Sequence, residues 1–205
     1  MDSVLRRALV LLALVLPLAL AACGSGSVQP PERSNAAPTC PKAWKAGWQA
    51  LADRIDARVY CPSWITPPLT GEIDGQWNNI FSVDKRDRSY LVGFTWYEVG
   101  SGEVHVNFRG YPETTRIPRC PGDAAGERIP CFADASGTKR IGGRDVTVYT
   151  ANQGADKWHV LYAWKENGAL YVVSEHVAEP YTYRKVVGFL DRMVRGLVRI
   201  EPEHA

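Results

Sequence analysis

The dipeptide Asn167-Gly168 constrains the fold of this chain more than any other local feature. It separates two runs, 158–165 and 169–177, that are rich in aromatic and β-branched residues. Asn-Gly favours a two-residue turn whose twist matches that of an antiparallel hairpin. We therefore expect these runs to pair as antiparallel strands. The turn also sets the register, with Trp164 opposite Tyr171, Tyr162 opposite Val173, and His159 opposite His176.

Other segments repeat the period of two that is typical of strands. Residues 76–83, 89–99 and 146–150 have this pattern. After a turn at 100–102, the chain alternates between two faces of a further strand, with Val104, Val106 and Phe108 on one face and His105, Asn107 and Arg109 on the other. This alternation predicts an antiparallel hairpin with one face in the core and one in water.

Two segments instead have the period of a helix. Trp44, Trp48, Leu51 and Ile55 recur on one face of a helix of about four turns that follows Pro41. A second helix is expected to begin at Pro180. Its apolar stripe consists of Val186, Val187, Leu190, Met193, Val194 and Leu197. The fold class is therefore α+β, with an antiparallel sheet of about five strands covered by an N-terminal and a C-terminal helix.

The first 23 residues resemble an export signal. Arg6 and Arg7 precede an uncharged apolar run, 8–22, which is shorter than the roughly 20 residues of a membrane-spanning helix. The run ends in Leu-Ala-Ala followed by Cys23, which resembles the lipobox of bacterial lipoproteins. The resemblance implies that residues 1–22 are a signal peptide. It also implies that Cys23 is diacylated, with palmitate-type chains, and holds the protein on the extracytoplasmic face of the cell membrane. An ordinary secreted protein with a free Cys23 is the alternative.

Residues 23–39 comprise this cysteine and a spacer of Gly, Ser, Pro and Ala, a composition that favours disorder. We expect a single globular domain over 40–205. In an exported protein its four cysteines are expected to form disulfides. Pairs near in sequence are Cys40–Cys61 and Cys120–Cys131, although four cysteines allow three connectivities. Their spacing matches no zinc motif.

No catalytic motif stands out in the sequence. There is no G-x-S-x-G, H-E-x-x-H, phosphate-binding loop or EF-hand loop. The net charge of +2 gives no reason to expect nucleic-acid binding. We therefore expect a non-enzymatic domain without a cofactor that binds an apolar molecule, a glycan or a protein. A cell-envelope hydrolase and a regulatory protein–protein interaction module are the alternatives.

Two groups of side chains are candidate sites. Trp96, Tyr162 and Trp164 could line a ligand pocket between sheet and helix. His159 and His176, directly opposite on neighbouring strands, would have Cβ atoms about 5 Å apart, close enough to share a divalent metal. His105 could join them only if its strand lies alongside.

A looser resemblance concerns the domain itself. It consists of the proline-rich entry at 59–67, the turn at 141–146, the hairpin turn at 164–168 and a closing helix. This order is similar to uncharacterised extracytoplasmic domains of bacterial lipoproteins and membrane-tethered regulators. It implies a curved sheet under a helix, as in lipoprotein carriers, and no catalytic residue.

Overall fold

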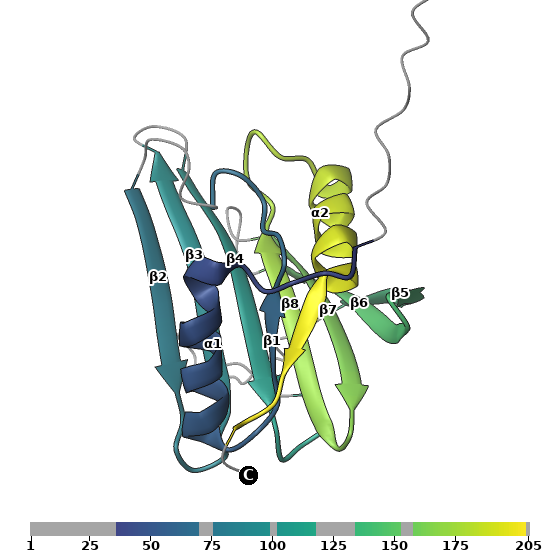
Figure 1. The fold of residues 1–205 in the computed structure, drawn as a ribbon. Coiled ribbons are helices and arrows are strands. Elements are labelled where there is room, and N and C mark those ends of the chain that lie inside the picture. Colours follow the sequence, from purple (N-terminus) through teal and green to yellow (C-terminus); the bar gives the residue numbers. More distant parts are fainter. Residues whose placement is uncertain (1–35, 70–75, 99–101, 118–133, 153–157, 204–205) are drawn as a thin grey trace, which may run out of the picture. The chain divides into compact units, whose positions relative to one another are not determined.

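A computed structural model describes residues 36–69, 76–98, 102–117, 134–152 and 158–203 (Figure 1). Residues 37–205 form one compact unit, separate from residues 1–36. This division falls within the predicted spacer, three residues before the predicted domain start at Cys40. The predicted Cys120–Cys131 disulfide and the predicted lipid attachment at Cys23 lie outside the described residues.

The domain is built on a seven-stranded antiparallel sheet with the order β2-β3-β4-β8-β7-β6-β5. Its strands are β2 (Gln76–Val83), β3 (Tyr90–Glu98), β4 (Gly102–Tyr111), β5 (Asp134–Ile141), β6 (Arg144–Asn152), β7 (Trp158–Glu166) and β8 (Ala169–His176). Most strands that pair in the sheet also follow one another in the sequence. The exception is the pairing of β4 with β8, which joins the two halves of the sheet.

One face of the sheet is covered by three elements (Figure 1). These are α1 (Lys42–Ile55), α2 (Tyr183–Arg195) and a ribbon in which β1 (Val59–Pro62) pairs with β9 (Leu197–Ile200). The ribbon lies between the helices, and the three elements share one apolar core with the sheet. We call this the covered face and the other side of the sheet the second face.

The α+β class, the antiparallel sheet and the two helices are as predicted, but the prediction of about five strands was too low. It missed the short strands β1 and β9, which pair across more than 130 residues, and placed Leu197 in the helix. It also assigned most of β5 to an irregular loop. Each missed strand is stabilised by a partner that local periodicity does not reveal.

The helix boundaries follow from local chemistry. Pro41 is the N-cap residue of α1, directly before its first residue. The second helix begins at Tyr183 rather than Pro180, because the hydroxyl of Thr182 accepts a hydrogen bond from the backbone N–H of Lys185 and caps it. It ends at Gly196, before the chain enters β9.

The Asn167-Gly168 hairpin is confirmed. Both residues have positive φ, 50° and 81°, as the predicted turn requires. Trp164 pairs with Tyr171, Tyr162 with Val173, and His159 with His176.

The predicted disulfide between Cys40 and Cys61 is also present. It joins Cys40, two residues before α1, to strand β1, so it fixes the start of the helix to the ribbon. The two cysteines are 21 residues apart in sequence. A loop of this size corresponds to a stabilisation of about 3 kcal/mol, most of it through the unfolded chain.

We expect the double variant Cys40→Ser/Cys61→Ser to fold but to lose about 3 kcal/mol of unfolding free energy, because its unfolded state regains the entropy of the open loop. Urea denaturation under non-reducing conditions measures this difference. A loss below about 1 kcal/mol would contradict the assigned role of the bond.

Gly110 in β4 is predicted to tolerate no side chain. A Cβ at this position would lie 2.2 Å from Cε1 of Tyr90, whose ring is buried in the core. We expect Gly110→Ala to destabilise the domain by roughly 1–3 kcal/mol through overpacking. Gly188→Ala on α2 is the matched control. It has open space around its Cβ and should be neutral or stabilising by up to about 1 kcal/mol in the same thermal melts.

Candidate functional site

The three aromatic residues predicted to line a ligand pocket are core residues instead. Trp96, Tyr162 and Trp164 are 8%, 0% and 3% exposed. The hydroxyl of Tyr162 donates a hydrogen bond of 2.8 Å to Asp191 on α2. The ring of Trp164 packs at 5.5 Å from that of Tyr60 in the ribbon. Tyr162 and Trp164 therefore attach α2 and the ribbon to the sheet.

Three histidines meet on the second face. His105, His176 and His159 lie on β4, β8 and β7, which are adjacent in that order. Their ring centroids are 4.8–5.0 Å apart. The sequence predicted the pair His159 and His176, and made the approach of His105 conditional on its strand lying alongside. The pairing of β4 with β8 meets that condition.

The imidazoles form a hydrogen-bonded cluster rather than a coordination sphere. The Nε2 atoms of His105 and His159 are 2.6 Å apart, so one ring donates and the other accepts. Two nitrogens bound to one zinc would lie about 3.3 Å apart, given bonds of about 2.0–2.1 Å in a tetrahedral site. Within the described parts of the chain, no three His, Cys, Asp or Glu side chains are placed to hold a metal ion.

One imidazole of the cluster has a strongly lowered pKa. Burial, with smaller contributions from nearby His176 and Arg109, lowers the pKa of His105 to about 4. His105 is therefore uncharged at pH 7. Neutral imidazoles can donate and accept hydrogen bonds at the same time, so the cluster can bind polar groups or accept a proton.

Arg109 lies on the same face of β4, four residues after His105. It is opposite Leu91 on β3 and Val172 on β8. Its Nη1 donates a hydrogen bond of 3.3 Å to the hydroxyl of Ser174. Burial lowers the pKa of the Arg109 guanidinium. The sequence placed Arg109 on a water-facing side; in the structure it is half-buried, because β4 lies beside β8, where every residue is buried.

A hollow of about 440 Å³ opens next to Arg109. It lies where β2 turns into β3, and Arg109 and Tyr111 of β4 reach it from the other side. Its polar lining includes Ser82, Asp84, Lys85, Ser89, Arg109 and Tyr111. Sequence reasoning missed this hollow because its walls come from three strands. The one local indication was the run of polar residues on the second face of β4.

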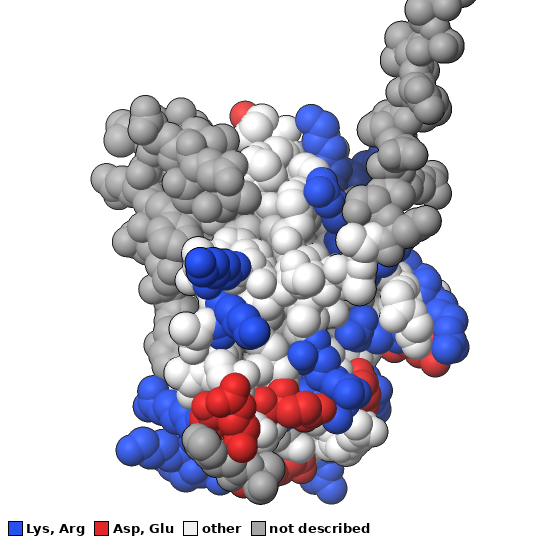
Figure 2. Space-filling model, in the orientation of Figure 1, with Lys and Arg blue, Asp and Glu red and all other residues white. Residues whose placement is uncertain are grey.

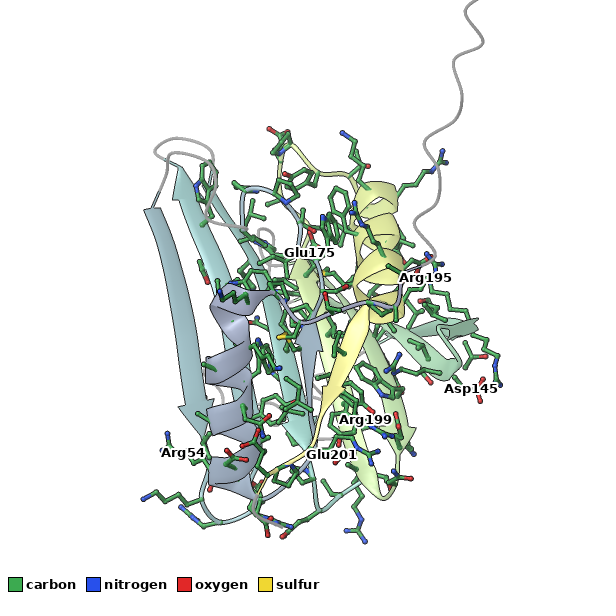
Figure 3. All side chains as sticks on the ribbon, in the orientation of Figure 1. Arg54, Asp145, Glu175, Arg195, Arg199 and Glu201 are labelled. Atoms are coloured by element: carbon green, nitrogen blue, oxygen red, sulfur yellow. A yellow bond between two sulfur atoms is a disulfide. The ribbon has the colours of Figure 1, made fainter. Side chains whose placement is uncertain are left out.

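A buried carboxyl group lies on the covered face. Glu175 is 0% exposed, and Figure 3 shows it near the end of β8 that leads to α2. The hydroxyl of Thr66 is 3.5 Å from its Oε2, and its Oε1 has no hydrogen-bond partner among the described residues. Burial raises the pKa of Glu175 to about 8, so the group is mainly protonated at pH 7. Glu175 pairs with Val106 of β4, whose side chain is in the core, so it faces away from the histidines.

Charged side chains on the outside are mixed in sign (Figure 2). At the ribbon, Arg58 bridges Glu166 and Glu201, at 3.3 and 2.8 Å, and Glu201 also pairs with Arg199. On the face in view, Lys and Arg are spread over most of the surface, whereas Asp and Glu gather mainly near its lower edge.

Comparisons with protein-family models, curated proteins and solved structures find no match to this chain. Of the helices in the described residues, none has the length and apolar character needed to cross a bilayer.

The protonated state of Glu175 predicts a pH-dependent stability. Its pKa is higher in the folded protein than the ordinary value of 4.5. The folded state therefore holds an extra proton between pH 4.5 and about 8. This contribution to stability is complete below pH 4.5 and is lost as the pH rises through 8.

We expect Glu175→Gln, which imitates the protonated group, to remove this loss. The variant should gain roughly 2 kcal/mol or more of unfolding free energy relative to the original protein between pH 6 and pH 9. Urea denaturation at both pH values measures it. The exposed Glu179→Gln is the control and should shift nothing. Equal pH profiles for Glu175→Gln and the original protein would contradict the prediction.

Proposed function

We propose that this chain is a lipid-anchored protein of the cell envelope whose folded domain acts by binding a ligand rather than by catalysis. The observation that carries the proposal is the apolar run 8–22 ending at Cys23, with a charged start and small residues before the cysteine. The acyl chains on Cys23 would insert into the membrane, and residues 24–39 would space the domain from it.

The Cys40–Cys61 disulfide supports the proposed location. Such bonds persist in oxidising compartments and are rare in the cytosol. An exported domain tethered at its N-terminus would form this bond after translocation. The compact unit that begins at Ala37 is consistent with a tether before the domain.

The second face supports a role in binding. It carries three adjacent imidazoles, of which His105 has a lowered pKa, a half-buried guanidinium and a polar hollow. Buried polar groups cost stability unless they are compensated, so a fold retains them where a ligand or a specific contact uses them. We assign the proposed binding role to this face rather than to the aromatic residues of the core.

The anchor is tested by expressing the full chain in a bacterial host that processes lipoproteins. We expect the protein in the membrane fraction, with an intact mass that lacks residues 1–22 and carries acyl chains on Cys23. Cys23→Ser should move the domain to the soluble fraction, because a free serine accepts no thioether-linked lipid.

Ser25→Ala, two residues away, is the matched control and should stay with the membrane. An unacylated mass for the original protein, or equal membrane fractions for Cys23→Ser and the control, would overturn the lipid anchor.

A further inference from the structure

Within the described residues, Arg109 differs from four other arginines in having no carboxylate partner. Arg58, Arg88, Arg140 and Arg199 each form an ion pair with a carboxylate. Among the described residues, Arg109 instead donates to the hydroxyl of Ser174, and no carboxylate contributes to the shift of its pKa. Arg140, by contrast, is an exposed residue paired with Asp145. The more buried cation is thus the one without a counter-charge.

A guanidinium in this position is costly to the ligand-free protein. Removing a cation from water without an opposing charge is unfavourable, and one neutral hydroxyl offsets little of that cost. The nearby imidazoles do not compensate it, because His105 is neutral and Arg109 itself helps to lower the pKa of that ring. An anion beside Arg109 would supply the missing charge.

The structure provides space for such an anion. The hollow beside Arg109, about 440 Å³, is of the size that small ligands occupy. Lys85 adds a second cation to its wall, and the hydroxyl groups of Ser82, Ser89 and Tyr111 can donate hydrogen bonds. The one carboxylate in the lining, Asp84, accepts a hydrogen bond of 2.8 Å from the backbone N–H of Arg86.

We propose that this hollow binds a small molecule through an anionic oxygen group, a carboxylate or a phosphate, with Arg109 as the principal donor. A guanidinium can hold two oxygens of such a group with parallel hydrogen bonds. Lys85 would add attraction at the entrance. The inference names the ligand class of the proposed binding domain, and so rests on its role in binding. It does not depend on the lipid anchor.

The histidines occupy the other end of the same strand face. Along β4, His105 comes first, then Asn107, Arg109 and Tyr111, so the hollow and the imidazole cluster flank Arg109 from opposite sides. The cluster leaves the guanidinium without a neighbouring negative charge. It therefore helps to keep Arg109 available to an external anion.

The test combines ligand response with stability in the purified full chain. Sodium phosphate and sodium acetate are titrated separately, with sodium chloride holding the ionic strength constant, and the melting temperature is followed. We expect it to rise with at least one of the two anions beyond the effect of chloride, because a ligand that binds only the folded state stabilises it. Phosphate alone would assign a phosphate ligand, and acetate alone a carboxylate.

Three variants separate a binding role from a structural one. Arg109→Met should weaken the anion response at least tenfold and should melt no lower than the original protein without anion, because an uncompensated charge has been removed. Arg109→Lys keeps the charge but cannot donate two parallel hydrogen bonds to one anion, so the anion should raise its melting temperature less than that of the original protein. Arg140→Met, the exposed control, should respond fully.

Two results would overturn the proposal. One is an original protein that responds no more to phosphate or acetate than to chloride. The other is an anion response of equal size in Arg109→Met and Arg140→Met. Either result would rule out the proposed anion site. It would not affect the proposed lipid anchor, which the Cys23→Ser fractionation tests separately.

Discussion

The width of the seven-stranded sheet determines how the rest of the domain is built. Strands about 4.8 Å apart make such a sheet roughly 29 Å wide, whereas one helix covers about 10 Å. Two helices therefore leave a strip of the covered face open. The ribbon of β1 and β9 fills that strip, and the Cys40–Cys61 bond fixes α1 to it. The ribbon joins a segment near the start of the domain to one near its end, so the cover forms only when the whole chain has come together.

The large aromatic residues hold this cover in place. Tyr60 of the ribbon packs against Trp164 and Tyr171 of the central hairpin and donates a hydrogen bond of 2.6 Å to Glu166. Burial and this hydrogen bond raise the pKa of Tyr60 to about 12, so the hydroxyl remains a donor at neutral pH. Tyr162 attaches α2 in the same way, through Asp191. Side chains that look suited to a ligand are thus used for assembly.

The charge state of the buried polar groups differs between the two faces of the sheet. On the covered face, Glu175 is surrounded by the core and avoids its charge by keeping a proton. On the second face, burial keeps His105 uncharged, whereas Arg109 stays charged, because a guanidinium retains its proton in proteins. We propose that the charge of Arg109 is balanced by another molecule, because among the described residues it has no carboxylate partner and borders the hollow.

The sequence alone determined what depends on neighbouring residues: the Asn167-Gly168 hairpin, its register, the helix at 42–55, and the pair His159 and His176. Turn geometry and side-chain period act over a few residues, so they can be read directly. The Cys40–Cys61 bond could be predicted because the two cysteines are near in sequence. Only the tertiary structure decided the ribbon, the approach of His105 and the burial of Arg109. These depend on β1 meeting β9 and on β4 meeting β8, contacts between distant segments whose free energy comes from covering the whole sheet.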